Sequence, residues 1–177
     1  MSNLQAREAL ERAQRLFLER PTAARKTVSA TAVLQNGIAC SMSNAEGRTL
    51  VTDMAKAMGG GGGGHSPGWL LRASLAACTA TSIAMRAALH GIELQELEVT
   101  VHSDVDLRGA VGIDGVSMAM TGMRMSIKVG ADGAPERTLR EIVAWGATQS
   151  TVSATLQEAR TLPIEVTLLS RAASSTS

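Results

Sequence analysis

The sequence predicts an α+β domain with antiparallel strands. Three observations favour this class: short strand-like segments precede residue 53, a long apolar helix follows residue 66, and further strand-like segments precede shorter helices after residue 96. Runs of strands followed by helices are typical of α+β folds, whereas a doubly wound sheet needs regular alternation of strands and helices. The 177 residues suit a single domain of this kind.

The first segment predicts an amphipathic helix. Apolar residues recur near helical spacing between residues 4 and 17 among charged residues, and Pro21 ends the pattern. We expect residues 1–26 to form this helix and a linker, residues 27–169 to form the domain, and residues 170–177 to be a disordered tail. Because the first segment is charged and lacks an uncharged apolar region, we expect no secretory signal and a cytoplasmic location.

The next segment predicts a three-stranded meander. Residues 27–43 are rich in Val, Thr, Ile and Ala, and Asn36-Gly37 in their middle favours a tight turn between two strands. A second turn at Glu46-Gly47 precedes a third short strand over Thr49–Thr52.

Six consecutive glycines, Gly59–Gly64, separate the meander from the long helix. The segment lacks the G-x-x-x-x-G-K-S/T spacing of a phosphate-binding loop, so we expect a mobile loop. Ser66 as N-cap and Pro67 in the first turn predict a helix from Pro67 to about His90. This helix is apolar nearly all round and should be enclosed, while its two arginines and its hydroxyl residues argue against a membrane span.

The remaining chain predicts strands and shorter helices. We expect strands over Leu97–Val105 and Val116–Val129, a helix from Glu136 to about Gly146, a short helix after Ser150, and a last strand over Ile164–Leu169.

Composition excludes several classes of function. A net charge of +1 and only three aromatic residues argue against a nucleic-acid partner. The histidines and cysteines are scattered without metal-ligand spacing, no serine-hydrolase motif is present, and no cofactor is expected. With two cysteines in a reducing compartment, we expect no structural disulfide.

Cysteine thiol chemistry is the remaining class of function. Cys40 lies in a strand among small residues and fits a small buried side chain, while Cys78 on the long helix is either a structural or a reactive cysteine. A reactive thiolate needs a nearby cation or a helix N-terminus, and Cys78 is about three turns inside its helix. Arg72 should point away from it around the helix. Arg48 is the candidate cation, with a plain surface residue or a cation from a partner subunit as the alternatives.

Three segments resemble the OsmC/Ohr family of cysteine-dependent hydroperoxide reductases: Ser66-Pro67-x-x-Leu70-Leu71, Ala77-Cys78-Thr79 and residues 150–156. The resemblance spans about residues 27–169. It implies an intertwined homodimer in which antiparallel sheets enclose two central helices per subunit, with the extra N-terminal helix outside this plan. It also implies that a thiolate at Cys78 attacks a peroxide, that a second cysteine forms a disulfide with it, and that a dithiol reductant reopens that disulfide.

Two positions depart from the family pattern. Gly68 stands where the family has a glutamate that orients an arginine, and Ser150 stands where it has the second cysteine. We therefore expect a homodimer that reduces an organic hydroperoxide by a one-cysteine route, with Cys78 as nucleophile, Arg48 and Ser150 as supporting residues, and an external thiol reductant. The alternatives are an inactive member that binds a hydrophobic small molecule or acts as a scaffold, and an interaction protein that docks through its N-terminal helix.

Overall fold

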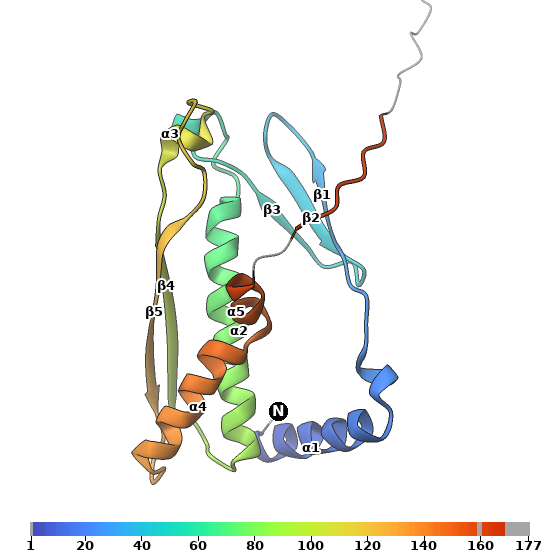
Figure 1. The fold of residues 1–177 in the computed structure, drawn as a ribbon, viewed down its shortest axis with the longest axis vertical. Helices are drawn as coiled ribbons and strands as arrows, with labels where there is room; N and C mark the ends of the chain where they lie inside the picture. The colour runs from blue at the N-terminus through green and yellow to red at the C-terminus, as the bar shows by residue number, and fades with distance from the viewer. Residues whose placement is uncertain (1, 159–160, 169–177) are drawn as a thin grey trace, which may run out of the picture.

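The chain folds into two antiparallel sheets and a set of helices around one long helix, α2, in the computed structural model, which describes residues 2–158 and 161–168 (Figure 1). The elements, in order, are α1 (Asn3–Glu19), η1 (Pro21–Ala24), β1 (Ala30–Leu34), β2 (Cys40–Asn44), β3 (Thr49–Thr52), η2 (Lys56–Met58), α2 (Pro67–Leu89), β4 (Glu96–Asp104), α3 (Leu107–Ala110), β5 (Thr121–Gly130), α4 (Glu136–Gln149) and α5 (Thr151–Gln157). Both sheets are antiparallel and helices pack beside them, which confirms the α+β class.

The first sheet is the predicted meander, in the order β1-β2-β3. Leu34 pairs with Cys40 across the first turn, where Gly37 adopts a positive φ of 58°. At the second turn the Asn44 side-chain oxygen accepts the backbone N–H groups of Glu46 (3.1 Å) and Arg48 (3.0 Å). The turn chemistry of the sequence thus defines both connections, and β3 has its predicted bounds.

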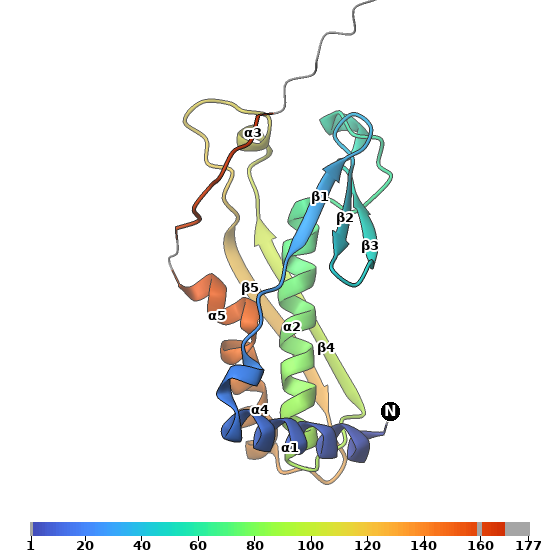
Figure 2. The same ribbon diagram turned by 90° about the vertical axis from the view of Figure 1, so that its right-hand side faces the viewer.

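Helix α2 begins as predicted, because the Ser66 hydroxyl accepts the N–H of Trp69 and Pro67 occupies the first turn. It packs against β4 on one side and against α4 on another, while α1 crosses its C-terminal end (Figures 1 and 2). Its buried stripe includes Ile83 and Ala87, which form a core cluster with Ile142 of α4. The two helices approach closely at Gly146, where an added Cβ would overlap the Ile83 side chain.

The second sheet pairs β4 with β5, with Glu96 opposite Gly130 and His102 opposite Arg124. The predicted strand over Val116–Val129 is wrong at its start, because β5 begins at Thr121. The short helix α3 precedes it and was not predicted. Gly109 of α3 packs so closely on the Ser117 backbone that a Cβ would lie 2.6 Å from the Ser117 oxygen, so this segment folds back on α3 before the strand begins.

The predicted last strand, Ile164–Leu169, does not form over its described residues, 164–168. A strand needs a neighbour that satisfies its backbone N–H and C=O groups, and no strand pairs with residues 161–168 in the described chain. Every second side chain of this segment is apolar and at least 74% exposed: Leu162, Ile164, Val166 and Leu168. Leu169 and the predicted tail lie outside the described residues.

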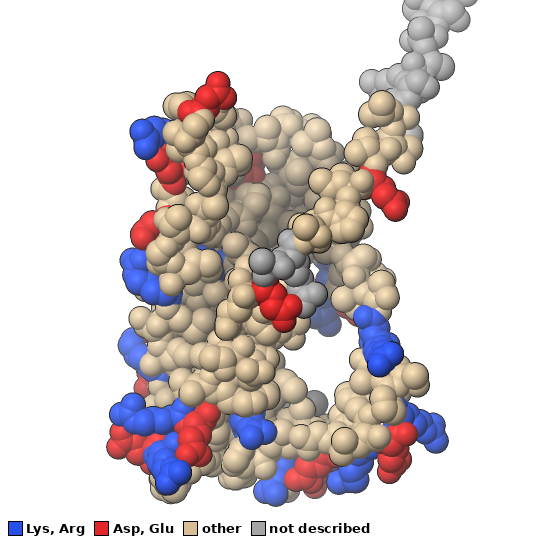
Figure 3. Space-filling view, in the orientation of Figure 1, with Lys and Arg blue, Asp and Glu red and all other residues tan. Residues whose placement is uncertain are grey.

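The chain exposes far more surface than its size requires. Its accessible area is 13,525 Å², whereas a compact monomer of this mass exposes about 8,000 Å². Figure 3 shows an opening between the helical body and the segment that joins α1 to the first sheet. The enclosure expected for α2 is incomplete within one chain, since Trp69 and Met85 are 43% and 44% exposed.

Candidate functional site

Cys78 lies midway along α2 and is half-buried. Its thiol has no hydrogen bond to another described residue, and neither has the thiol of Cys40 on β2. Both cysteines are free. The helix places Cys78 directly before Thr79, whose side chain is fully buried.

Ser150 contacts the part of α2 that carries Cys78. It ends α4 and caps α5, where its hydroxyl accepts the N–H of Ser153 (3.4 Å). The same hydroxyl lies 3.4 Å from the Thr79 hydroxyl, within hydrogen-bond distance. The structure thus brings the two predicted motif segments together, although the direct partner of Ser150 is Thr79 and no hydrogen bond joins Ser150 to Cys78 within the described chain.

Arg48 lies in the turn between β2 and β3 and is exposed. Its backbone is held by Asn44 on both sides, through the Asn44 side-chain oxygen and the Asn44 N–H. No hydrogen bond or ion pair joins its guanidinium to another residue in the described ranges. Within one chain the structure therefore does not bring Arg48 to Cys78, and its supporting role stays a prediction.

Arg72 points away from Cys78, as expected. Its guanidinium donates to the Ser103 hydroxyl (3.1 Å) on β4 and to the Met120 sulfur (3.8 Å). Met120 also contacts the start of α2, because a Cβ at Gly68 would lie 2.9 Å from its terminal methyl. Met120 thus takes the space beside Gly68, a role that the sequence did not reveal because this segment has the pattern of a strand.

Asp53 organises the glycine loop and was also missed. The residue is 4% exposed, and its carboxylate accepts N–H groups from Met54 (2.7 Å), Gly61 (3.0 Å) and Gly63 (3.0 Å). These bonds, with that of Gly63 foremost, hold the pKa of Asp53 below its ordinary value. Gly60 and Gly64 pass so close to the backbones of Met54 and Val51 that a Cβ at either position would overlap them. The loop therefore has a defined anchor, which the expectation of a mobile loop did not include.

The end of the glycine loop is tied to both β3 and α2. The Asp53 N–H donates to the His65 carbonyl (3.2 Å), and Thr52 forms a parallel bridge with His65. The His65 ring stacks on Trp69 with ring centres 3.8 Å apart. Asp53 therefore fixes the position of the start of α2, the helix that carries Cys78.

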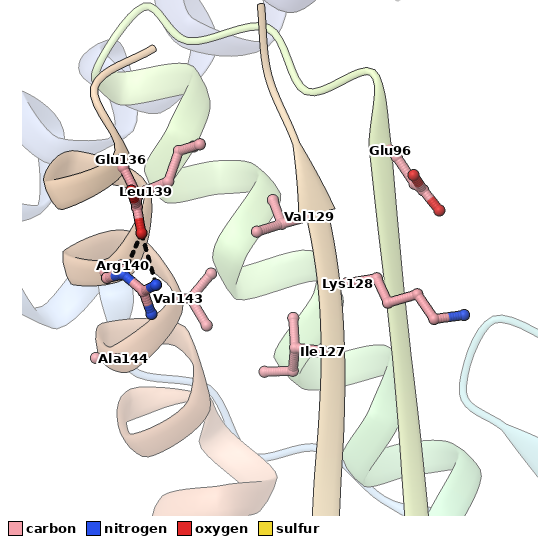
Figure 4. A pocket seen from close by; sticks show the side chains of 9 residues that line it. All are labelled: Glu96, Ile127, Lys128, Val129, Glu136, Leu139, Arg140, Val143 and Ala144. Carbon is pink, nitrogen blue, oxygen red and sulfur yellow. Dashed lines mark hydrogen bonds and ion pairs between the residues drawn. The ribbon is translucent and has the colours of Figure 1, made fainter.

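A cavity of about 600 Å³ lies between α4 and β5 and does not include Cys78 (Figure 4). Ile127 and Val129 of β5 and Val143 of α4 line it. Its two cationic residues are already paired, Arg140 with Glu136 (2.6 Å) and Lys128 with Glu98 (2.8 Å), whereas its carboxylate Glu96 has no ion pair within the described ranges. The cavity therefore offers no free cation to an anionic ligand.

Neither a metal site nor a membrane-spanning helix is found among the described residues. They contain no cluster of three or more His, Cys, Asp or Glu side chains that could hold a metal ion. No helix within these ranges combines the length and hydropathy that a membrane span requires.

A family model described as "OsmC-like protein" matches residues 59–166, more than half of the chain. The chain belongs to the OsmC-like protein family. The matched range contains the glycine loop, Cys78 and Ser150, so the candidate site lies within the part that defines this family. No curated protein sequence matches the chain.

Solved structures agree with this OsmC-like fold. An OsmC-like protein from Mycoplasma pneumoniae has a TM-score of 0.62 at 17% identity, over 75% of this chain and 88% of that one. A protein from Legionella pneumophila described as an organic hydroperoxide resistance protein has a TM-score of 0.53 at 19% identity, over 75% and 90%. One from Elizabethkingia anophelis with the same description has a TM-score of 0.54 at 16% identity, over 75% and 89%. At these identities the likeness concerns the fold.

Proposed function

We propose that this OsmC-like protein is a homodimer that reduces organic hydroperoxides by a one-cysteine route through Cys78. The observation that carries the proposal is the meeting of the two motif segments, in which Ser150 contacts Thr79, the neighbour of Cys78. The family and the fold-level likeness to hydroperoxide resistance proteins support it. The site would lie on α2, beyond the anchor that Asp53 provides for the helix.

The reaction balances with an external thiol. The Cys78 thiolate attacks one peroxide oxygen, the O–O bond breaks, and the organic fragment leaves as an alcohol after taking a proton, so that Cys78 becomes a sulfenic acid. An external thiol then attacks the sulfenic sulfur and releases water. A second external thiol displaces Cys78 from the mixed disulfide and restores the thiolate. Since Ser150 has no thiol, it cannot replace either external thiol.

The excess surface supports the dimer. The accessible area exceeds that of a compact monomer by several thousand Å². The residues outside the described ranges could account for at most about 1,800 Å² of this difference, even if they were fully exposed. Obligate homodimers commonly bury 2,000–5,000 Å² or more, by order of magnitude, about the size of this excess. A second copy would cover the exposed start of α2 around Trp69 and residues 161–168. It would also be the source of the cation that Cys78 lacks within one chain, with Arg48 as the candidate.

The test is the reaction of Cys78 with stoichiometric cumene hydroperoxide in the presence of dimedone, which traps sulfenic acids. We expect the adduct on Cys78 and not on Cys40, and turnover when a small dithiol is supplied. The Cys40→Ser variant should keep both results, and the Cys78→Ser variant should lose both. A dimedone adduct confined to Cys40, or no adduct at all, would contradict the proposed peroxidase activity.

A second candidate function is supported by a separate observation. Cys78 has no hydrogen-bonded partner in the described chain, and Gly68 with Met120 beside it replaces the glutamate of the family pattern. An inactive OsmC-like member that binds a hydrophobic small molecule or acts as a scaffold fits this arrangement. An unreactive Cys78 in a well-folded dimer would favour it.

A further inference from the structure

A second cavity lies where α1, α2 and α4 meet and has a volume of about 320 Å³. Its walls are mainly apolar, and each of the three helices supplies part of them, such as Leu10 and Phe17 of α1, Leu89 of α2 and Trp145 of α4. Helix α1 lies outside the range matched by the family, so this cavity depends on a part of the chain that the family does not define. Its volume is within the range of small-molecule sites.

Arg86 is the one charged residue among these walls. Its guanidinium carbon lies over the Trp145 ring, 5.1 Å from the ring centre, which is within the range of a cation–π contact. No hydrogen bond or ion pair joins its N–H groups to another residue within the described ranges. A guanidinium carries five N–H donors, and a cation–π contact through its carbon does not use them as hydrogen-bond donors.

The contrast with the larger cavity identifies the ligand charge. In the cavity between α4 and β5 both cationic residues have a carboxylate partner, Arg140 in Glu136 and Lys128 in Glu98. Arg86, a half-buried residue, has no such partner in the described chain, although it stands among mainly apolar walls where a lone charge is costly. A carboxylate would meet the free edge of the guanidinium through two parallel hydrogen bonds.

We propose that this cavity is a binding site for a single-chain amphipathic carboxylate, with Arg86 as the contact for the carboxylate. The acyl chain lies against Leu10, Phe17 and Leu89, and the Ser82 hydroxyl and the Gln14 amide are the remaining polar groups on the walls. Along α2 the walls extend from Ser82 to Leu89, about 10 Å by helix rise, which suits an acyl chain of medium length.

The site is independent of the proposed peroxidase reaction. Ser82 follows Cys78 by four residues and therefore lies one turn further along the same face of α2. No lining residue is a cysteine, and no step of binding needs the thiol. The Cys78→Ser variant should bind the carboxylate as the unchanged chain does, which separates failure of this proposal from failure of the proposed function.

The experiment is calorimetric titration of the full chain with decanoate, kept well below its micelle concentration, and with decanol as the matched uncharged probe. We expect saturable decanoate binding at least about tenfold tighter than decanol binding, and an increase in melting temperature with decanoate. Arg86→Gln should remove the advantage of decanoate and leave decanol binding unchanged. Ala13→Phe should fill the cavity and block both probes, whereas Arg140→Gln should affect neither.

Three results would overturn the proposal. Equal affinity for decanoate and decanol would show that Arg86 does not select an anion. Unchanged decanoate binding in Arg86→Gln, in a variant that keeps its melting temperature, would place the carboxylate elsewhere. No binding of either probe to the folded chain would show that a second copy of the chain, or nothing, occupies this cavity.

Discussion

The hydroxyl of Ser150 lies 3.4 Å from the hydroxyl of Thr79, and the two side chains are almost completely buried, at 1% and 0% exposure. The contact joins the junction of α4 and α5 to the middle of α2, across 71 positions of the sequence. It fixes the distance between the helix that carries Cys78 and the segment that completes the family pattern. Stability and cross-linking experiments can both test it.

Ser150→Ala should lower the free energy of unfolding by about 1–3 kcal/mol, because it removes the cap of α5 and leaves the Thr79 hydroxyl without this partner. Urea unfolding measures the change. Ser126→Ala, at an exposed position of β5, should stay within about 0.5 kcal/mol of the unchanged chain. Equal effects of the two substitutions would contradict the role of Ser150.

Ser150→Cys, made in a Cys40→Ser background, should form a disulfide with Cys78 on mild oxidation. The expectation follows from the contact of Ser150 with the residue after Cys78, since disulfides need Cα atoms about 4.4–6.8 Å apart. Peptide mass mapping of the oxidised protein identifies the bond. If both thiols remain free to alkylate, position 150 does not correspond to the second cysteine of the family.

Gly146→Ala should destabilise the fold by about 1–3 kcal/mol, because the new Cβ would overlap the Ile83 side chain and lie 3.0 Å from the Ile83 backbone nitrogen. Thermal or urea unfolding provides the measurement. Gly68→Ala is the matched control, since its Cβ would meet only the flexible end of Met120 and alanine favours a helix. A Gly68→Ala chain less stable than Gly146→Ala would argue against close packing of α2 on α4.

Asp53→Asn should destabilise the chain more at pH 7 than at pH 3. The folded-state pKa of Asp53 is held below the ordinary value of 3.8 by backbone N–H groups, with that of Gly63 foremost. The stabilisation by the carboxylate is therefore complete above pH 3.8 and is lost as the pH falls through the lower folded-state pKa. Melting temperatures of the two chains at both pH values give the comparison, and Asp114→Asn serves as an exposed control. A difference that grows toward low pH would contradict this role.

Light scattering should give a mass of about twice 18.4 kDa at micromolar concentration. Ile164→Asp should weaken this association, because a charge would be placed in a segment whose apolar side chains have no cover within one chain. Glu165→Gln, at the neighbouring position, is the control for a change of charge. If the chain without substitutions is a monomer, the proposed dimer is ruled out, and so is a cation supplied to Cys78 by a second copy.

The elements that the sequence predicted correctly carry local signals. Asn36-Gly37 determines the first turn, Ser66 and Pro67 begin α2, and Ser150 caps α5, and each acts within a few residues. These signals do not depend on the rest of the fold. The position of Ser150 at the start of a short helix was predictable for the same reason.

The missed features depend on contacts between distant segments. Asp53 accepts N–H groups eight and ten residues ahead, and Arg72 donates to Ser103 on another element. The start of β5 depends on the packing of Gly109 against Ser117. Residues 164–168 have the alternation of a strand, but pairing needs a neighbour that one chain does not supply. Periodicity indicates which conformation a segment favours, and it does not show which partner the segment meets.

The bonds from Asp53 give the glycine loop a fixed length. A run of six identical residues suggests a linker whose length can change freely. Here Gly61 and Gly63 donate to one carboxylate, while Gly60 before them and Gly64 after them pass close to the backbones of Met54 and Val51. One glycine more or fewer would shift a donor away from the carboxylate or a side-chain-free position away from a close approach. The number of residues in this loop is therefore as constrained by the structure as their identity.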